Sequence, residues 1–118
     1  MAELIDMENV TLENNCFRRV IYTGKYMQVV LMSLRAGEPI PIEIHKQVDQ
    51  FFRVEEGLME IHTYTSKNKK VEIGTISVGS GQSGVVPAGT WHEVIAVEDT
   101  KLYTIYSPPQ HPPGKIEC

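Results

Sequence analysis

Residues Gly37–Gly57, with the sequence GEPIPIEIHKQVDQFFRVEEG, decide the fold that we expect for this chain. Glu43 and His45 stand two residues apart, so on a β-strand their side chains leave the same face of the sheet. Gln50 follows after a short turn and opens a second expected strand, Phe51–Glu56. A carboxylate, an imidazole and an amide on one wall resemble a set of ligands for a divalent metal. We therefore expect a metal-binding cup whose remaining ligand comes from elsewhere in the chain.

Length and composition indicate a single domain over residues 1–118. The chain has 118 residues and a formal net charge of −4, and a chain of this length buries roughly two thirds of its unfolded surface. The negative charge and the lack of a basic cluster argue against nucleic acid as a partner. No apolar run approaches the roughly 18 residues of a membrane span, and the acidic N-terminus is unlike a secretory signal. We therefore expect a cytoplasmic protein with no membrane partner.

The two cysteines are expected to be free thiols. Cys16 and Cys118 lie far apart in the sequence, and two cysteines do not make the disulfide framework of a small secreted domain. A terminal cysteine such as Cys118 could still form an adventitious bridge between two molecules.

Short apolar segments separated by turn residues predict an all-β protein. The strongest is Tyr26–Arg35, whose alternating faces are both largely apolar, so we expect it to be covered on both sides. Short strands with regularly spaced turns are typical of a sandwich or a closed barrel, here with a core over residues 17–107. We expect no helix, and a proline-rich tail over residues 107–118 that lies extended on the surface.

The segments between these landmarks complete the expected topology. Pro39 and Pro41 keep their segment extended but exclude it from the middle of a regular ladder, and Ser66–Lys70 is expected to be a solvated hairpin tip. The nine expected strands are Phe17–Tyr22, Tyr26–Arg35, Ile42–His45, Phe51–Glu56, Leu58–Thr65, Val71–Ile76, Val85–Pro87, Trp91–Val97 and Lys101–Tyr106.

Two separated clusters of glycine, proline and potential ligands have a characteristic spacing. The first consists of Gly37, Glu43, His45, Gln50 and Gly57, and the second of Gly81, Pro87, Gly89 and His92. In spacing and residue type they resemble the two motifs of the cupin superfamily, and the resemblance extends over residues 26–107. It implies a cupin-type double-stranded β-helix, a jelly-roll β-barrel. The metal ligands that it implies are Glu43, His45, Gln50 and His92.

Three positions depart from the commonest cupin pattern. Most cupins carry His-x-His followed by Glu, where this chain has Glu43-x-His45 followed by Gln50. The second motif usually ends in Asn, where this chain has Ala96. The stretches VDQFFRVEEG, VVPAGTWHEV and LYTIYSPPQHPPG resemble small single-domain cupins that are described as mannose-6-phosphate isomerase-like. That description reports likeness and not activity.

The expected ligands form a mixed nitrogen and oxygen site. Such a set suits zinc, iron(II), manganese, nickel or cobalt, and with Glu43 ionised a bound dication leaves a charge of about +1 that favours an anionic ligand. Taken singly, each residue has a simpler explanation: Glu43-x-His45 as an exposed pair, Gln50 as a hydrogen-bonding residue, His92 as a buried structural histidine. A cupin that has kept the barrel and lost the metal therefore remains an alternative.

Strand alternation selects the side chains that we expect to contact a small-molecule ligand: Gln28, Met32, Phe52 and Tyr103. Gln28 needs a polar partner if it points inward, and a water-facing edge position is its alternative. Met32 is expected to pack and not to ligate, and Tyr103 is placed at the mouth of the cup. His111 is expected to be a surface residue.

Outward-facing apolar side chains at Phe51, Trp91 and Ile95 are expected either to pack between the two sheets or to form a dimer face. Because small cupins commonly form dimers through such edges, the resemblance implies a homodimer.

Four functions follow from these expectations. The leading one is an enzyme that uses the metal as a Lewis acid on a small polar or anionic metabolite, with Glu43 as its catalytic proton carrier. Isomerisation or tautomerisation of a sugar or sugar acid fits this ligand set. The alternatives are an iron- or manganese-dependent dioxygenase, a non-catalytic module that binds or senses a small molecule, and a metal-free scaffold.

Overall fold

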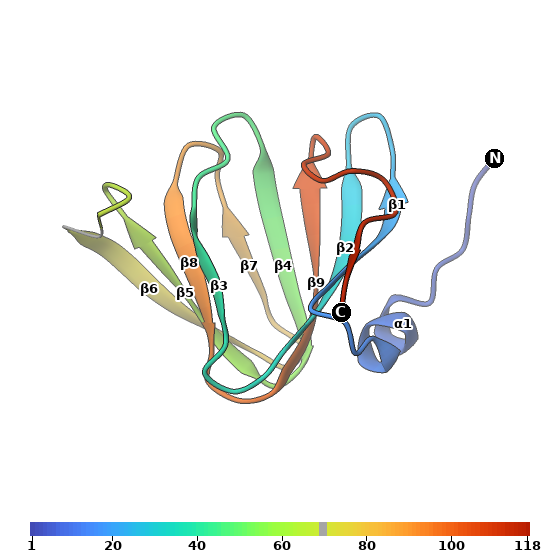
Figure 1. Cartoon of the computed structure of the whole chain (residues 1–118), viewed down its shortest axis with the longest axis horizontal. Coiled ribbons are helices and arrows are strands. Elements are labelled where there is room, and N and C mark those ends of the chain that lie inside the picture. The colour runs from blue at the N-terminus through green and yellow to red at the C-terminus, as the bar shows by residue number, and fades with distance from the viewer. Residues whose placement is uncertain (69–70) are drawn as a thin grey trace.

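The chain folds into two facing antiparallel β-sheets with a short helix outside them (Figure 1). The computed structural model describes residues 1–68 and 71–118. In chain order the elements are α1 Met7–Glu13, β1 Arg18–Thr23, β2 Gln28–Leu34, β3 Pro39–Glu43, β4 Asp49–Glu56, β5 Leu58–Tyr64, β6 Glu72–Gly79, β7 Ser83–Val86, β8 Trp91–Ala96, β9 Thr100–Ser107 and β10 Ile116–Glu117.

The strand order is that of a jelly roll. One sheet has six strands in the order β10-β1-β2-β9-β4-β7, and the other has four in the order β3-β8-β5-β6. β1–β2 and β5–β6 are hairpins of consecutive strands, but the other sheet neighbours, such as β2 and β9, are far apart in the sequence because the chain crosses repeatedly between the sheets. The predicted all-β jelly-roll barrel is confirmed.

The hydrophobic core lies between the two sheets. Every second residue of β2 points into it, and these residues, Val30, Met32 and Leu34, are buried. The intervening residues Val29 and Leu31 are buried as well, because α1 and the N-terminal segment cover the outer face of β2. The expectation that this strand is covered on both sides is therefore confirmed.

The helix α1 was not expected from the sequence. It has seven residues and begins at Asp6, whose side chain accepts a hydrogen bond from the backbone N–H of Asn9, an ordinary N-cap. Its Thr11 is buried against the sheet. An isolated helix of this length is not stable in water, so packing on the sheet decides its structure, and a local pattern could not predict it.

The expectation of free thiols is wrong. Cys16 and Cys118 form a disulfide across 102 residues of sequence. The reason is the strand β10, which pairs antiparallel with β1 through Arg18↔Glu117 and Arg19↔Ile116. This pairing brings the last residue of the chain beside the residues that precede β1, although nothing in the sequence indicates that the two segments are neighbours.

Gly57 of the first motif shapes the turn between β4 and β5. Its φ angle is +106°, and a Cβ atom there would lie 2.3 Å from the carbonyl oxygen of Asp99. Only glycine fits without displacing the backbone. The hairpin tip expected at Ser66–Lys70 includes Lys69 and Lys70, which lie outside the described residues.

Within the described part of the chain, no helix is long and apolar enough to cross a membrane.

Candidate metal centre

The three strongest predicted ligands come from neighbouring segments at one end of the barrel. Glu43 ends β3 and His92 is the second residue of β8, and the two are directly paired across these strands. His45 follows β3 by two residues. Gln50 is the second residue of β4, in the facing sheet. The alternation of strand side chains directs all of them toward the space between the sheets.

Glu43, His45 and His92 form a compact cluster of donor atoms. One potential ligand atom from each lies within 4.8 Å of the other two. The Oε1 atom of Glu43 is 3.1 Å from Nε2 of His45 and 3.5 Å from Nε2 of His92. His45 and His92 are only 8% and 1% exposed, whereas the side chain of Glu43 is 30% exposed. The cluster is therefore shielded from solvent at the two histidines and accessible to solvent at Glu43.

The buried atoms of this cluster lack ordinary hydrogen bonds. Glu43 Oε1, both ring nitrogens of His45 and Nε2 of His92 have no hydrogen-bond partner within the described structure. The short contacts to Glu43 meet the distance for a hydrogen bond but not its geometry. Buried polar atoms are almost always satisfied, and leaving one unsatisfied costs about 1–3 kcal/mol. Several such atoms converging on one point are what a metal ion would satisfy.

His92 is held in the tautomer that a metal ligand requires. Its Nδ1 lies 2.9 Å from the carbonyl oxygen of Thr90. Because a carbonyl can only accept a hydrogen bond, Nδ1 carries the proton, and in the neutral ring Nε2 presents its lone pair to the cluster. Metal-bound histidines are usually oriented in this way by a second hydrogen bond.

Gln50 presents an oxygen in the same region. It is 1% exposed, and its Nε2 donates a 3.0 Å hydrogen bond to Oγ1 of Thr104. Its Oε1 is buried with no hydrogen-bond partner among the described residues. An amide oxygen is the ligand atom that glutamine offers to a divalent metal. The fixed amide nitrogen therefore leaves the oxygen as the unused group.

Electrostatics keep Glu43 ionised. Burial alone would raise its pKa, but the imidazoles of His45 and His92 close to the carboxylate outweigh burial and lower the pKa to about 2. The donor set at neutral pH is thus a carboxylate and two imidazoles. These residues fit zinc, iron(II), manganese or nickel.

The other predicted contact residues have different positions. Met32 and Phe52 are completely buried in the core. Tyr103 does not line the mouth of the cup as expected: it lies on the outer face of β9, half-buried against Phe51 with ring centroids 6.4 Å apart. The inner residues of β9 are Leu102, Thr104 and Tyr106.

The residue missed in the sequence is Tyr106. It is buried, and its ring lies edge-on to His45 with centroids 5.5 Å apart. Burial and the negative charge of Glu43 both raise the pKa of its hydroxyl, so Tyr106 is neutral at physiological pH. The alternation of β9 groups Tyr106 with Leu102 and Thr104 on one face, but only the structure shows that this face points inward.

Gln28 points inward as expected, and its polar partner is the C-terminal tail. It is fully buried, and its Nε2 donates to the carbonyl oxygen of His111 at 2.7 Å and to Oγ1 of Thr23 at 3.0 Å. The water-facing alternative is thereby excluded. Gln28 anchors the tail and has no free group to offer a ligand.

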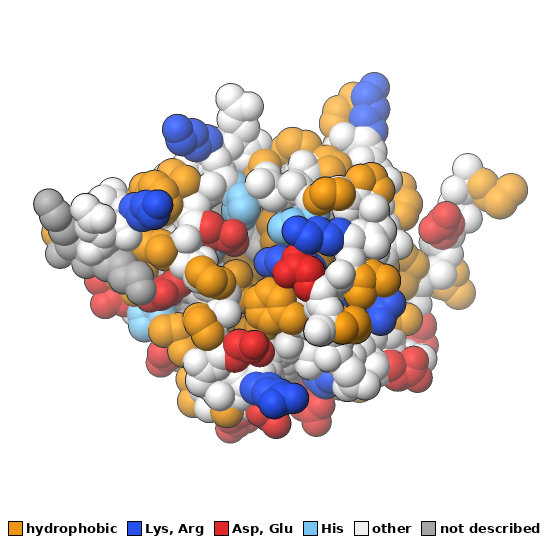
Figure 2. Space-filling view, viewed as in Figure 1, with side chains coloured by type: hydrophobic (Ala, Val, Ile, Leu, Met, Phe, Trp, Pro, Cys, Tyr) orange, Lys and Arg blue, Asp and Glu red, His pale blue; other side chains and the backbone are white. Residues whose placement is uncertain are grey.

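His111 is half-buried, although it was expected on the surface. Its ring lies edge-on to Tyr106 with centroids 5.2 Å apart, and its Nε2 is 3.3 Å from the Tyr106 hydroxyl. Burial, followed by the charge of Arg18, lowers the pKa of His111 to about 4. A neutral imidazole therefore lies next to the residue that packs on His45. Figure 2 shows histidine side chains near the centre of this face, among acidic and basic side chains.

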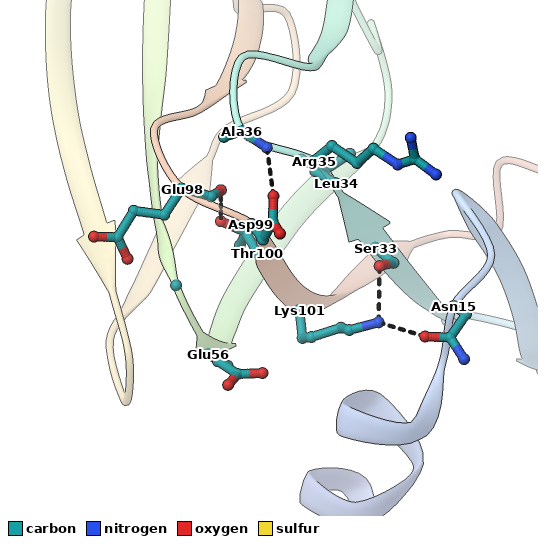
Figure 3. Close-up of a pocket in the computed structure, with 11 residues that line it drawn as sticks. Asn15, Ser33, Leu34, Arg35, Ala36, Glu56, Glu98, Asp99, Thr100 and Lys101 are labelled. Carbon is teal, nitrogen blue, oxygen red and sulfur yellow. Dashed lines mark hydrogen bonds between the residues drawn. The ribbon is translucent and has the colours of Figure 1, made fainter.

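A separate polar cavity of about 830 Å³ lies at the opposite end of the barrel (Figure 3). The ammonium group of Lys101 in this cavity already has hydrogen-bond partners, because Nζ donates to Oγ of Ser33 and Oδ1 of Asn15. Asp99 accepts a hydrogen bond from the backbone N–H of Ala36. None of the predicted metal ligands lines this cavity, so it is distinct from the metal cluster.

The sequence model of the family described as "Cupin domain" matches residues 30–106. The chain belongs to the cupin family. It is 44% identical over 115 residues to the uncharacterised protein YrkC of Bacillus subtilis, covering 96% of this chain and 61% of YrkC. The chain thus spans less than two thirds of the length of that relative.

Solved structures agree with this assignment. BH2720 from Bacillus halodurans is 39% identical, with a TM-score of 0.93 over 99% of this chain and 89% of that protein. KdgF from Halomonas sp. has a TM-score of 0.67 at 20% identity, over 79% of this chain and 78% of that protein. The second likeness shows a shared fold alone.

Proposed function

We propose that this cupin is a metal-dependent enzyme in which Glu43, His45, Gln50 and His92 hold a divalent metal. The observation that carries the proposal is the set of buried donor atoms without hydrogen-bond partners among the described residues. Zinc, iron, manganese and nickel are all compatible with two imidazoles, one carboxylate and one amide oxygen. The substrate is a small polar or anionic metabolite.

The proposed reaction is isomerisation or tautomerisation of a sugar or sugar acid, in keeping with the resemblance to mannose-6-phosphate isomerase-like cupins. A bound divalent metal supplies Lewis acidity toward a carbonyl or enolate oxygen. Glu43 is the proton carrier because its carboxylate is ionised and is the most accessible of the four ligands. With Glu43 ionised, a dication leaves a charge of about +1, which favours an anionic substrate.

The enzyme is further proposed to be a cytoplasmic homodimer. Phe51, Trp91 and Ile95 on the outer faces of the sheets are only partly buried in the single chain. More strongly exposed are Ile73 and Val85, on the edge strands β6 and β7. Apolar surface of this kind favours association with a second copy.

Elemental analysis of protein purified without added metal tests the proposal. Wild-type protein is expected to contain about one metal ion per chain, and E43A and H92A are each expected to lose most of it. The matched control is H62A, because His62 Nε2 lies 3.1 Å from Glu60 Oε1, the same separation as in the His45–Glu43 pair. Full metal content in both E43A and H92A would refute the proposed site.

A second function is favoured by one specific feature. Two histidines and one carboxylate are the ligand set of many non-haem iron(II) oxygenases, and Glu43, His45 and His92 match it. Oxygen uptake by iron-loaded protein in the presence of candidate metabolites separates the two proposals. A zinc protein that consumes no oxygen excludes the dioxygenase. A tight small-molecule complex without turnover instead supports a binding or sensing role.

A further inference from the structure

Residues 108–118, which we call the C-terminal strap, connect the metal end of the barrel to the edge of the six-stranded sheet. The strap is anchored at its start by Gln28, whose side chain is fully buried. Oε1 of Gln28 accepts hydrogen bonds from the backbone N–H groups of Gln110 and His111 at 3.1 and 2.9 Å, and Nε2 donates to the carbonyl oxygen of His111. The buried amide of Gln28 thus pairs with two N–H groups and one carbonyl group of the strap backbone.

The strap is connected to the metal cluster through two aromatic contacts in series. The ring of His111 packs on Tyr106, and the ring of Tyr106 packs in turn on His45. The charge of Glu43 also acts on His111. A displacement of the strap would therefore uncover Tyr106 and remove a neighbour from one wall of the metal cup.

The far end of the strap is held by few non-covalent interactions. The strand β10 has two residues, paired with Arg18 and Arg19 of β1, and the backbone N–H of Val20 donates to the carbonyl oxygen of Lys115 at 2.9 Å. Glu117 forms an ion pair with Arg18 at 2.7 Å. Within the described structure, a disulfide cross-link joins Cys118 at the end of the strap to Cys16. A two-residue strand at a sheet edge frays easily, so the disulfide is the most durable link at this end of the strap.

The strap begins at the same end of the barrel as the metal cluster. The edge strands β3 and β10 belong to different sheets, and Figure 1 shows β3 and the strap on the viewer's side, one in front of each sheet. Three of the four predicted ligands are nearly inaccessible, and Glu43 at the end of β3 is the exposed one. A ligand therefore enters beside Glu43, at the end of the barrel where His111 of the strap packs on Tyr106.

We propose that the Cys16–Cys118 disulfide is a redox latch that keeps the strap closed over the metal cup. This inference rests on the proposed function, because the latch regulates access to the metal. A dithiol reductant opens it: one of its thiolates attacks a sulfur of the disulfide, which releases one cysteine thiolate and leaves the other cysteine in a mixed disulfide. The second thiolate of the reductant then attacks the reductant sulfur of the mixed disulfide and releases the remaining cysteine thiolate. The reductant becomes a cyclic disulfide, while Cys16 and Cys118 gain two electrons and two protons as thiols. Disulfides of cytoplasmic proteins are usually transient or redox-sensing, in agreement with such a role.

The test is the rate at which the zinc-loaded full chain loses its metal to excess EDTA. Oxidised wild-type protein is compared with the C118S variant and with wild-type protein pretreated with dithiothreitol that is then removed under argon. Both open forms are expected to release zinc faster by about fivefold or more, the lower end of typical coupling between sites. K115A is the control, since it removes an exposed ion pair of the strap with Glu117 and keeps the disulfide; it is expected to behave as wild type.

Equal release rates in the oxidised, reduced and C118S proteins would overturn the latch and leave the metal site intact. Two rapidly reactive thiols in the native protein after air oxidation would also overturn it. If wild-type protein binds none of zinc, iron, manganese and nickel, the proposed function fails, and the latch is then judged by hydrogen exchange of the strap amides. Faster exchange at residues 110–118 after reduction supports the latch, and unchanged exchange refutes it.

Discussion

Replacing Gln50 with leucine distinguishes a metal ligand from a structural amide, because the two roles predict opposite changes in stability. In the metal-free protein, Q50L removes a buried Oε1 with no hydrogen-bond partner among the described residues, a group whose burial costs about 1–3 kcal/mol. The substitution also removes the hydrogen bond to Thr104 Oγ1, a loss of about 1 kcal/mol. The metal-free variant should therefore be as stable as wild type or more stable by up to about 2 kcal/mol.

With metal present, the effect of Q50L is reversed. A metal that binds only the folded state stabilises it by about 2.7 kcal/mol when its free concentration is 100 times the Kd. If loss of the amide oxygen weakens binding about 100-fold, the same concentration stabilises the variant by only about 0.4 kcal/mol. The metal-dependent gain should therefore fall by about 2.3 kcal/mol, a difference of several degrees in Tm for a domain of this size.

Urea unfolding at pH 7, with and without a fixed concentration of free zinc, measures both effects on the same protein. The control is Q47L, which makes the same substitution three residues earlier at an exposed position and should leave the metal-dependent gain unchanged. A Q50L protein that is less stable without metal and gains as much from zinc as wild type would refute the assignment of Gln50 as a ligand.

Three further predictions follow from other contacts. Burial lowers the pKa of His62, but its hydrogen bonds to the carboxylates of Glu72 and Glu60 outweigh burial and raise the pKa above 6.5. His62 therefore contributes stability that is complete below pH 6.5 and is lost as the pH rises through the folded-state pKa. H62A should flatten this part of the curve of unfolding free energy against pH, and an unchanged slope would contradict the assignment. G57A should destabilise the folded protein by at least about 2 kcal/mol, and G81A by only about 1 kcal/mol. Both glycines have positive φ, but of the two only Gly57 has backbone atoms within contact distance of an added Cβ atom. Equal losses of unfolding free energy in urea would refute the steric argument. Light scattering should give twice the 13.3 kDa chain mass, and a mass of one chain at micromolar concentration would contradict the homodimer.

The sequence predicted most of the barrel because its strands depend on local properties. Apolar runs such as Val29–Leu34 and turn glycines such as Gly57 specify strands and corners without knowledge of their partners. The motif spacing then gave the end of the barrel at which Glu43, His45 and His92 meet. These features could be predicted because strand alternation and the positive φ of a turn glycine are properties of a few consecutive residues.

The features that could not be predicted depend on contacts between distant segments. Cys16 bonds to Cys118 only because β10 pairs with β1. The side chain of Gln28 donates a hydrogen bond to His111 in the tail, 83 residues away. Tyr103 was placed in the wrong phase because β9 alone does not show which of its faces meets the other sheet. Its burial pattern, with Leu102, Thr104 and Tyr106 inside, depends on the neighbouring strands β2 and β4.

The chain contains two Glu-x-His pairs, and only their surroundings distinguish them. In both Glu43-x-His45 and Glu60-x-His62, the carboxylate lies 3.1 Å from the imidazole Nε2. His62 is on an outer face, where its Nδ1 lies 2.7 Å from Glu72 and both ring nitrogens therefore have carboxylate partners. His45 is buried, and neither ring nitrogen has a hydrogen-bond partner in the described structure. The spacing of a Glu-x-His pair is therefore no argument for a metal. Burial together with donor atoms that have no hydrogen-bond partner is such an argument, and by that criterion His45 is the candidate ligand and His62 belongs to a solvated ion pair.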